Sequence, residues 1–142
     1  MIHLERILTL RKSSLFDSVS LEKVSILAAS LSERSFSPSE CIVKEDDDCT
    51  SLYVVAKGSV LVRYCGMDVV VDDGGFFGEL GIFHDEIIPL SASAEGDVLA
   101  FEVDGDLYRR VLAEEFGLAD NLLRSLVRRI ISVAEKNQKE SS

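Results

Sequence analysis

The stretch Phe77-Gly78-Glu79-Leu80-Gly81 decides the fold of this 142-residue chain. A flexible turn, Asp72-Asp73-Gly74-Gly75, leads into it, and an earlier segment reads Ser51-Leu52-Tyr53-Val54-Val55-Ala56-Lys57-Gly58-Ser59-Val60. In the earlier segment a β-prone apolar run is broken by a glycine, which is the pattern of a strand that ends in a turn. The later stretch places glycines around one carboxylate and one leucine. The two segments together indicate β structure that a glycine-rich turn interrupts.

Short β-prone segments lie on both sides of this stretch. They are predicted over Cys41–Lys44, Leu52–Ala56, Val60–Tyr64, Val69–Val71, Leu90–Ala94 and Val98–Val103. Turn residues recur between them, which is typical of a closed or sandwiched antiparallel β unit. The predicted fold class is α+β, mainly β: an antiparallel β-roll or jelly roll of about eight strands, flanked by N-terminal helices and two C-terminal helices.

The N-terminal helices are predicted from apolar spacing. The first spans about His3–Ser13, and the second begins after Ser20, which is a good N-cap residue. The second helix has one face that follows helical spacing, made of Leu21, Val24, Leu27, Ala28 and Leu31. We therefore expect these helices to pack one apolar face against the roll.

The C-terminal helices follow the last predicted strand. Asp104 is the expected N-cap of the first one, and the longest helix runs from after Gly117 to about Lys136 with a wide apolar stripe. We expect a single domain over residues 1–136 and a polar tail over residues 137–142.

The combination resembles the cyclic-nucleotide-binding domain family of the catabolite-activator and kinase regulatory-subunit type. Ser51–Val60 is similar to the family's hairpin, LY-apolar-apolar-x-x-G-x-V, and Phe77–Gly81 is similar to its FGEL phosphate cassette. Leu90-Ser91-Ala92-Ser93 is similar to its RSAT strand except at the first position. The resemblance covers about residues 5–135, and its order and spacing are specific for the fold.

The resemblance implies a ligand site for cyclic AMP or cyclic GMP, and no other cofactor. Its residues are Gly78, Glu79, Leu80, Gly81, Leu90, Ser91 and Ala92. In the family the cyclic phosphate lies against backbone N–H groups at the start of a short helix. Gly78 would let the backbone approach the phosphate, Glu79 would accept a hydrogen bond from the ribose 2′-hydroxyl, and Leu80 and Gly81 would offer amides. The serine after the arginine position would add a hydroxyl or an amide.

The arginine that clamps the phosphate in this family is absent. Leu90 stands in its position, and neither Arg nor Lys lies between Arg63 and Arg109. Residues 40–106 carry three basic and sixteen acidic side chains, a net charge of −13 that disfavours an anion. Losing a buried charged partner costs about 2–5 kcal/mol, or about 30- to several-thousand-fold in affinity. The sequence therefore predicts weakened or degenerate binding of cyclic nucleotides. A replacement cation could come from His84, Arg63, Lys57 or a residue of the last helix.

Composition excludes several other functions. The net charge of −10 argues against a nucleic-acid partner. No apolar run approaches the ~20 residues that span a bilayer, and the N-terminus lacks the order of a signal peptide, so we expect a cytoplasmic protein without membrane insertion. Three cysteines and two histidines show no metal-ligand spacing, and no nucleophile motif or acid–base pair stands out. We expect neither a metal site nor enzyme activity.

The sequence thus predicts a regulatory or sensory domain whose ligand, held in the roll, is coupled to motion of the C-terminal helix. The alternative is a protein-interaction or dimerisation module of the same fold, or a domain of a larger transporter, kinase or transcription regulator. The apolar stripe of the last helix, Leu122–Val133, either packs on the roll or forms a homodimer. Its basic side chains, Arg124, Arg128 and Arg129, form either a solvated face or a docking surface for a protein partner.

Overall fold

The computed structural model describes residues 1–84 and 89–141 of the chain. The elements within them are α1 (His3–Arg11), η1 (Ser14–Phe16), α2 (Leu21–Ser30), β1 (Ser32–Phe36), β2 (Cys41–Val43), β3 (Ser51–Lys57), β4 (Val60–Tyr64), β5 (Met67–Val71), β6 (Phe76–Phe77), α3 (Glu79–Phe83), β7 (Leu90–Ala94), β8 (Val98–Asp104), α4 (Gly105–Glu114) and α5 (Phe116–Ser141). Helices flank eight antiparallel strands at both ends of the described chain, so the predicted β-roll is confirmed.

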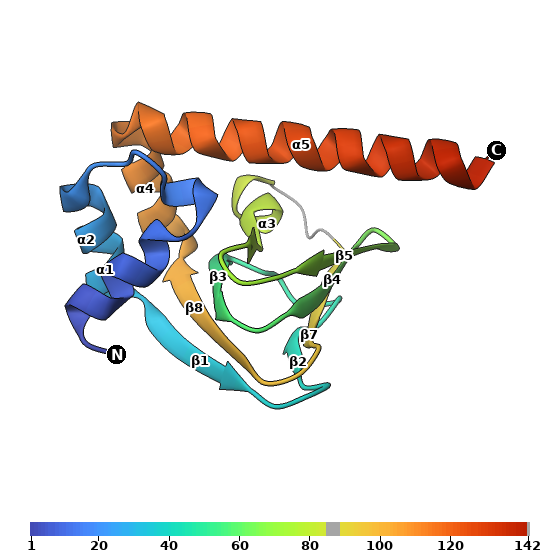
Figure 1. Cartoon of the computed structure of the whole chain (residues 1–142), viewed down its shortest axis with the longest axis horizontal. Helices are drawn as coiled ribbons and strands as arrows, with labels where there is room; N and C mark the ends of the chain where they lie inside the picture. The colour runs from blue at the N-terminus through green and yellow to red at the C-terminus, as the bar shows by residue number, and fades with distance from the viewer. Residues whose placement is uncertain (85–88, 142) are drawn as a thin grey trace.

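The strands form two four-stranded antiparallel sheets. One sheet has the order β1-β8-β3-β6, and the other has the order β2-β7-β4-β5. Figure 1 shows the two sheets facing each other, with α1, α2 and α4 gathered at the outer side of β8 and β3. The first sheet is therefore covered on both faces, by helices outside and by the second sheet inside.

Burial on both faces explains why the middle of β3 is a continuous apolar run. Leu52 and Val54 pack with the helices, whereas Tyr53 and Val55 belong to the interior of the roll. A strand with two covered faces needs apolar residues at every position, and four successive β3 residues are buried accordingly. Strand β4 alternates buried and less buried residues instead, because its sheet is covered on one face.

Two strands and two helix ends differ from the sequence prediction. Strand β1 directly follows α2 but has the polar sequence SERSF, and β6 contains only two residues, so neither carries a clear strand pattern. Leu21 was expected on the buried face of α2, yet it is 62% exposed, because it lies in the first turn after the Ser20 cap. Helix α5 continues beyond Lys136 to Ser141, so the segment expected as a polar tail is helical through residue 141.

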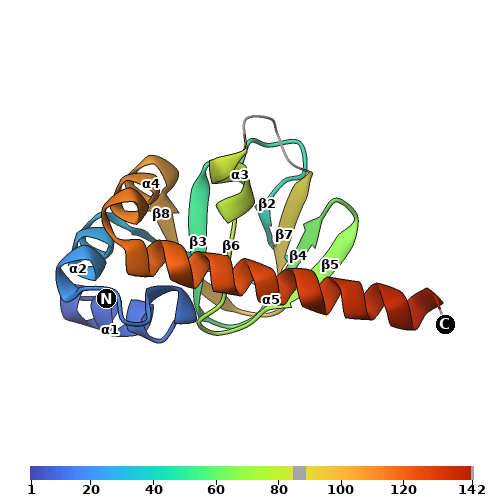
Figure 2. The ribbon, with the colours of Figure 1, turned by 90° about the horizontal axis from the view of Figure 1, so that it is seen from above.

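Helix α5 is the longest element and lies along one side of the molecule. Figures 1 and 2 show it passing α4 and the roll, with its C-terminal end beyond the β4–β5 hairpin. Leu118 and Leu122, near its start, are buried in the helical core. Asn121 donates hydrogen bonds to the carbonyl oxygens of Leu15 and Asp17, 3.0 and 2.6 Å away. The first turns of α5 are thus fixed to the N-terminal helices.

Candidate functional site

The turn between β6 and α3 contains the predicted cassette. Gly78 is the residue before α3 and has a φ of +93°, in the left-handed region that favours glycine. A Cβ at Gly78 would overlap the carbonyl oxygen of Ser51, and a Cβ at Gly81 would overlap that of Cys49. Both glycines therefore let α3 pack against the backbone that leads into β3. The close approach expected between Gly78 and a phosphate stays a prediction, and the structure shows a close approach of Gly78 to the protein's own chain at Ser51.

Glu79 is the first residue of α3, and its side chain is only 1% exposed. Burial raises the pKa of its carboxyl group, and the positive charge of Arg129 opposes that shift without cancelling it. One carboxylate oxygen, Oε1, accepts a hydrogen bond from Arg129 of α5. Among the described residues the other oxygen, Oε2, is buried without a hydrogen-bond partner. Glu79 therefore has one free acceptor next to a single buried ion pair.

Arg129 reaches the cassette from α5 and is held there by several groups. Its guanidinium pairs with Glu79 and donates a second hydrogen bond to the carbonyl oxygen of Phe76, 3.4 Å away. It also lies over the rings of Tyr64 and Phe76, 5.4 and 5.5 Å from their centroids. Aromatic faces attract a cation, most strongly where water is excluded. These contacts join α5 to both β6 and α3.

Two buried phenols complete the surroundings of Glu79. The hydroxyls of Tyr64 and Tyr108 are buried without a hydrogen-bond partner among the described residues. Burial raises the pKa of both phenols, and the negative charge of Glu79 raises it further. The phenols therefore stay protonated and remain hydrogen-bond donors near the carboxylate.

The predicted site residues on β7 face two directions. Leu90 and Ala92 are buried in the roll interior, where Leu80 of α3 packs against the same cluster. Ser91 alternates with them and pairs in register with Arg63, on the other face of the strand. The structure thus brings Leu80, Leu90 and Ala92 together, and it points the Ser91 side chain away from them.

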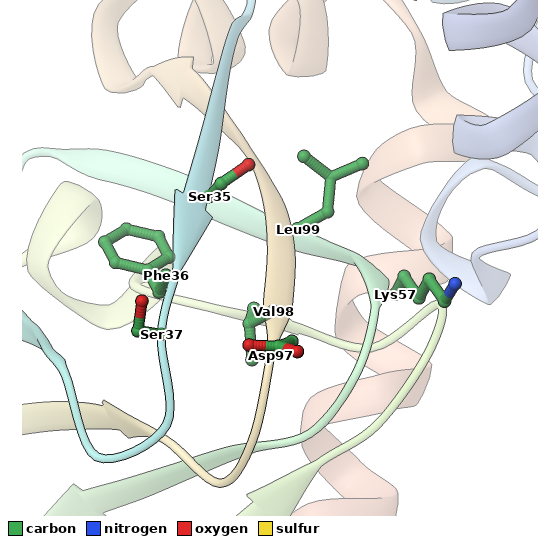
Figure 3. A pocket seen from close by; sticks show the side chains of 7 residues that line it. All are labelled: Ser35, Phe36, Ser37, Lys57, Asp97, Val98 and Leu99. Carbon is green, nitrogen blue, oxygen red and sulfur yellow. The ribbon is translucent and has the colours of Figure 1, made fainter.

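The four candidate cations lie in different places. Arg63 forms an ion pair with Asp68, 2.7 Å away, on the exposed hairpin. Lys57 lines a cavity of about 370 Å³ whose other lining residues are Ser35, Phe36, Ser37, Asp97, Val98 and Leu99. Figure 3 shows these side chains pointing in different directions, and no cassette residue is among them. His84 lines a cavity with Glu79 and Leu80. Arg129, a residue of the last helix, donates a hydrogen bond to Glu79 of the cassette.

Sequence reasoning named Arg129 as part of a basic face and expected a possible replacement cation from the last helix, but it did not single out Arg129 for that place. The spacing of the inward-facing residues of α5 nevertheless indicated that Arg129 turns toward the core. The residues that turn toward the core, Leu118, Leu122 and Leu126, continue at helical spacing to Arg129 and then to Val133. Arg129 therefore interrupts the inner stripe of the helix, and a charge at such a position requires a buried partner.

The described part of the chain shows few signs of other chemistry. Its histidine, cysteine and carboxylate side chains do not gather in groups of three that could hold a metal ion. No helix within residues 1–84 or 89–141 is long and apolar enough to cross a membrane. The three cysteines are unpaired, and Cys49 lies beside Gly78 and Gly81 under the cassette.

A family profile described as the cyclic nucleotide-binding domain matches residues 33–115 of the chain. A curated relative, a cGMP-dependent protein kinase from Eimeria tenella, is 29% identical over 125 residues. That match covers 87% of this chain but only 12% of the kinase, so the chain spans a small part of its relative.

Solved structures share the fold. The catabolite activator protein of Thermus thermophilus is 25% identical, with a TM-score of 0.73 over 91% of this chain and 63% of that one. A regulatory subunit of a cAMP-independent protein kinase A from Trypanosoma cruzi, solved with bound guanosine, is 20% identical. Its TM-score is 0.67, over 77% of this chain and 40% of that one.

Proposed function

The chain belongs to the cyclic nucleotide-binding domain family, and we propose that it senses a ligand in the roll and transmits the ligand's presence to helix α5. The observation that carries the proposal is the buried pair between Glu79 and Arg129, because it joins the cassette directly to α5. A ligand that engages the α3 turn acts on the carboxylate to which α5 is tied. The proposed role is regulatory and non-catalytic, and we propose the cytoplasm as its compartment.

We propose that the affinity for cyclic nucleotides is weak. Leu90 stands in the position of the family's phosphate-binding arginine and is 1% exposed in an apolar cluster. The guanidinium that does reach the cassette, that of Arg129, is already neutralised by Glu79. A cyclic phosphate would thus lose its water without gaining a full positive charge in return, which is costly for a buried anion.

The same observations favour a second candidate ligand, an uncharged nucleoside. A nucleoside keeps the ribose hydroxyls, from which the Glu79 carboxylate can accept hydrogen bonds. It lacks the phosphate group that needs an arginine. The regulatory subunit from Trypanosoma cruzi that shares the fold was solved with guanosine. We propose a nucleoside as the ligand to test alongside cyclic AMP and cyclic GMP.

The proposal also includes a protein partner at α5. The exposed residues of this helix include large apolar side chains, Leu123, Val127, Ile130 and Ile131, with exposed fractions between 52% and 68%. An interaction or dimerisation module that binds no nucleotide would use the same surface. Ligand titration separates these two functions.

Calorimetric titration of the chain with cyclic AMP, cyclic GMP, guanosine and adenosine tests the proposal. We expect measurable heat for at least one nucleoside and weaker binding of the cyclic nucleotides. Leu90→Arg should strengthen cyclic-nucleotide binding about tenfold to a hundredfold, the effect of one charged hydrogen bond. It should leave nucleoside binding unchanged.

Leu90→Gln is the matched control, because it places a polar but uncharged side chain at the same buried position. Thermal melting of both variants shows whether they remain folded. The sensing function is wrong if none of the four ligands binds at millimolar concentration. If Leu90→Arg and Leu90→Gln bind cyclic nucleotides equally, Leu90 does not face the phosphate.

A further inference from the structure

A cavity of about 420 Å³ lies among helices α3, α4 and α5, and its lining residues come from these helices rather than from the strands of the roll. Phe83 of α3, Leu112 of α4 and Ala119 of α5 are among them. Apart from Glu79 and His84, the residues that line it are apolar. Sites for small molecules are usually concave, mostly apolar and about 300–1,000 Å³ in volume. The cavity therefore has the size and the walls of a site for a small molecule with an apolar body.

Glu79 adds little polar surface to this cavity. Its side chain is only 1% exposed, and its Oε1 atom accepts a hydrogen bond from Arg129. The negative charge of this carboxylate is thus compensated from another side and is largely covered by protein. A molecule in the cavity meets a surface that is apolar almost throughout, so the sign of its charge is decided at the edge.

A cation lies at the edge of the cavity. The guanidinium of Arg109, on α4, lies over the ring of Phe83, 5.7 Å from its centroid, and Phe83 is itself 45% exposed. Arg109 and Leu112 are three positions apart, so they are neighbours on one side of α4. Within residues 1–84 and 89–141 the Arg109 guanidinium has no carboxylate partner. The planar fork of an arginine in this place can bind a carboxylate whose apolar body lies in the cavity.

We propose that this cavity binds a small carboxylic acid with an apolar body, whose carboxylate pairs with Arg109 and whose body packs between Phe83 and α5. Both parts of the ligand are needed. An acid without the apolar body would gain only an exposed ion pair, which contributes little. An apolar body without the carboxylate would leave Arg109 unpaired. The site lies outside the roll, so its test does not depend on the proposed function, and its failure would leave that function untouched.

Calorimetric titration of the full chain with 2-naphthoate, 2-naphthamide and acetate tests the ligand class. 2-Naphthoate has two fused rings and one carboxylate, and 2-naphthamide has the same shape without the charge. We expect 2-naphthoate to bind about five- to tenfold more tightly than 2-naphthamide, the factor of one charged pair at a partly exposed position. Acetate should give no heat. The proposal is wrong if the two naphthyl ligands bind the wild type equally, or if 2-naphthoate gives no heat at millimolar concentration.

Arg109→Gln removes the cation at the edge, and the two naphthyl ligands should then bind equally. Arg110→Gln is the matched control, because Arg110 is the next residue of the same helix and is also exposed. This control should keep the preference of the wild type for 2-naphthoate. If both variants lose the preference to the same extent, Arg109 is not the partner of the carboxylate and the proposal fails.

Substitutions in the wall test the place of binding. Ala119→Phe fills the cavity and should abolish the binding of both naphthyl ligands, whereas Ala134→Phe, in a neighbouring cavity of about 360 Å³ on the same helix, should bind them as the wild type does. Loss of binding in Ala134→Phe alone would move the ligand to that neighbouring cavity and overturn the proposal.

Thermal melting shows whether the two phenylalanine variants fold. If Ala119→Phe does not fold, Leu123→Asp decides, because Leu123 lines the cavity and is 61% exposed. Its new carboxylate should weaken the binding of 2-naphthoate more than that of 2-naphthamide, since like charges repel. Unchanged affinities for both ligands in Leu123→Asp would contradict the site.

Discussion

Glu79 combines burial, a raised pKa and a single charged partner, so its protonation should affect the stability of the fold. Between about 4.5, the ordinary pKa of a glutamate carboxyl, and the raised pKa of Glu79, the folded state holds a proton that the unfolded state has lost. The free energy of unfolding contributed by Glu79 therefore falls as the pH rises from 4.5 through the raised pKa. Glu79→Gln cannot titrate, so the stability of the wild type relative to this variant should decline over that range.

Urea denaturation of the two proteins across a pH series measures this difference. Glu135→Gln, at an exposed position of α5, is the control and should follow the wild type. If the stability of the wild type relative to Glu79→Gln instead increased with pH, the attraction of Arg129 would lower the pKa of Glu79 by more than burial raises it.

The turn that begins α3 depends on glycine for two separable reasons. Gly78 and Gly66 both have positive φ, +93° and +83°, so alanine is strained at either position, by roughly 1–2 kcal/mol. A Cβ at Gly66 would meet nothing within 4 Å, whereas one at Gly78 would overlap the Ser51 carbonyl oxygen. Gly78→Ala should therefore destabilise the fold by about 1–3 kcal/mol more than Gly66→Ala, as overpacking does. Chemical denaturation measures the free energy of unfolding of both variants. Equal destabilisation would show that the backbone at Ser51 can shift to make room for a Cβ at position 78 at little cost.

Elements with a strong local pattern could be predicted from the sequence, and those without one could not. β7 and β8 follow alternating or continuous apolar residues, and the Ser20 cap precedes α2 as expected. β1 could not be found because its residues are polar, and its strand form comes from pairing with β8. Tertiary pairing of this kind leaves no local trace in the sequence.

The turn that begins α3 was predictable from the sequence, whereas its contacts were not, and the binding of a ligand there stays a prediction. The sequence shows the turn at Gly78 and the leucine at position 90 in place of the family's arginine. These two features identify the cassette. The Glu79–Arg129 pair joins residues 50 positions apart, and its formation depends on where α5 lies against the roll. The charge within the inner stripe of α5 indicates that a partner exists, but only the three-dimensional arrangement identifies it as Glu79.

At the scale of the whole molecule, the exposed apolar side of α5 predicts self-association. Leu123, Val127 and Ile130 are spaced by four and three residues, the repeat by which two helices pair along one seam. The C-terminal end of the helix also extends beyond the roll (Figures 1 and 2). Sedimentation velocity over a range of concentrations should show a monomer–dimer equilibrium.

The combined substitution Val127→Glu and Ile130→Glu should make the protein monomeric, because it places four like charges at the seam of the paired helices. Leu8→Glu alters an apolar side chain of α1 that is 56% exposed, and as the control it should leave the equilibrium unchanged. Dissociation by Leu8→Glu would move the interface to the N-terminal helices. A wild type that stays monomeric at all concentrations would leave the α5 surface to a different protein partner, since so large an apolar side on a helix is seldom left uncovered.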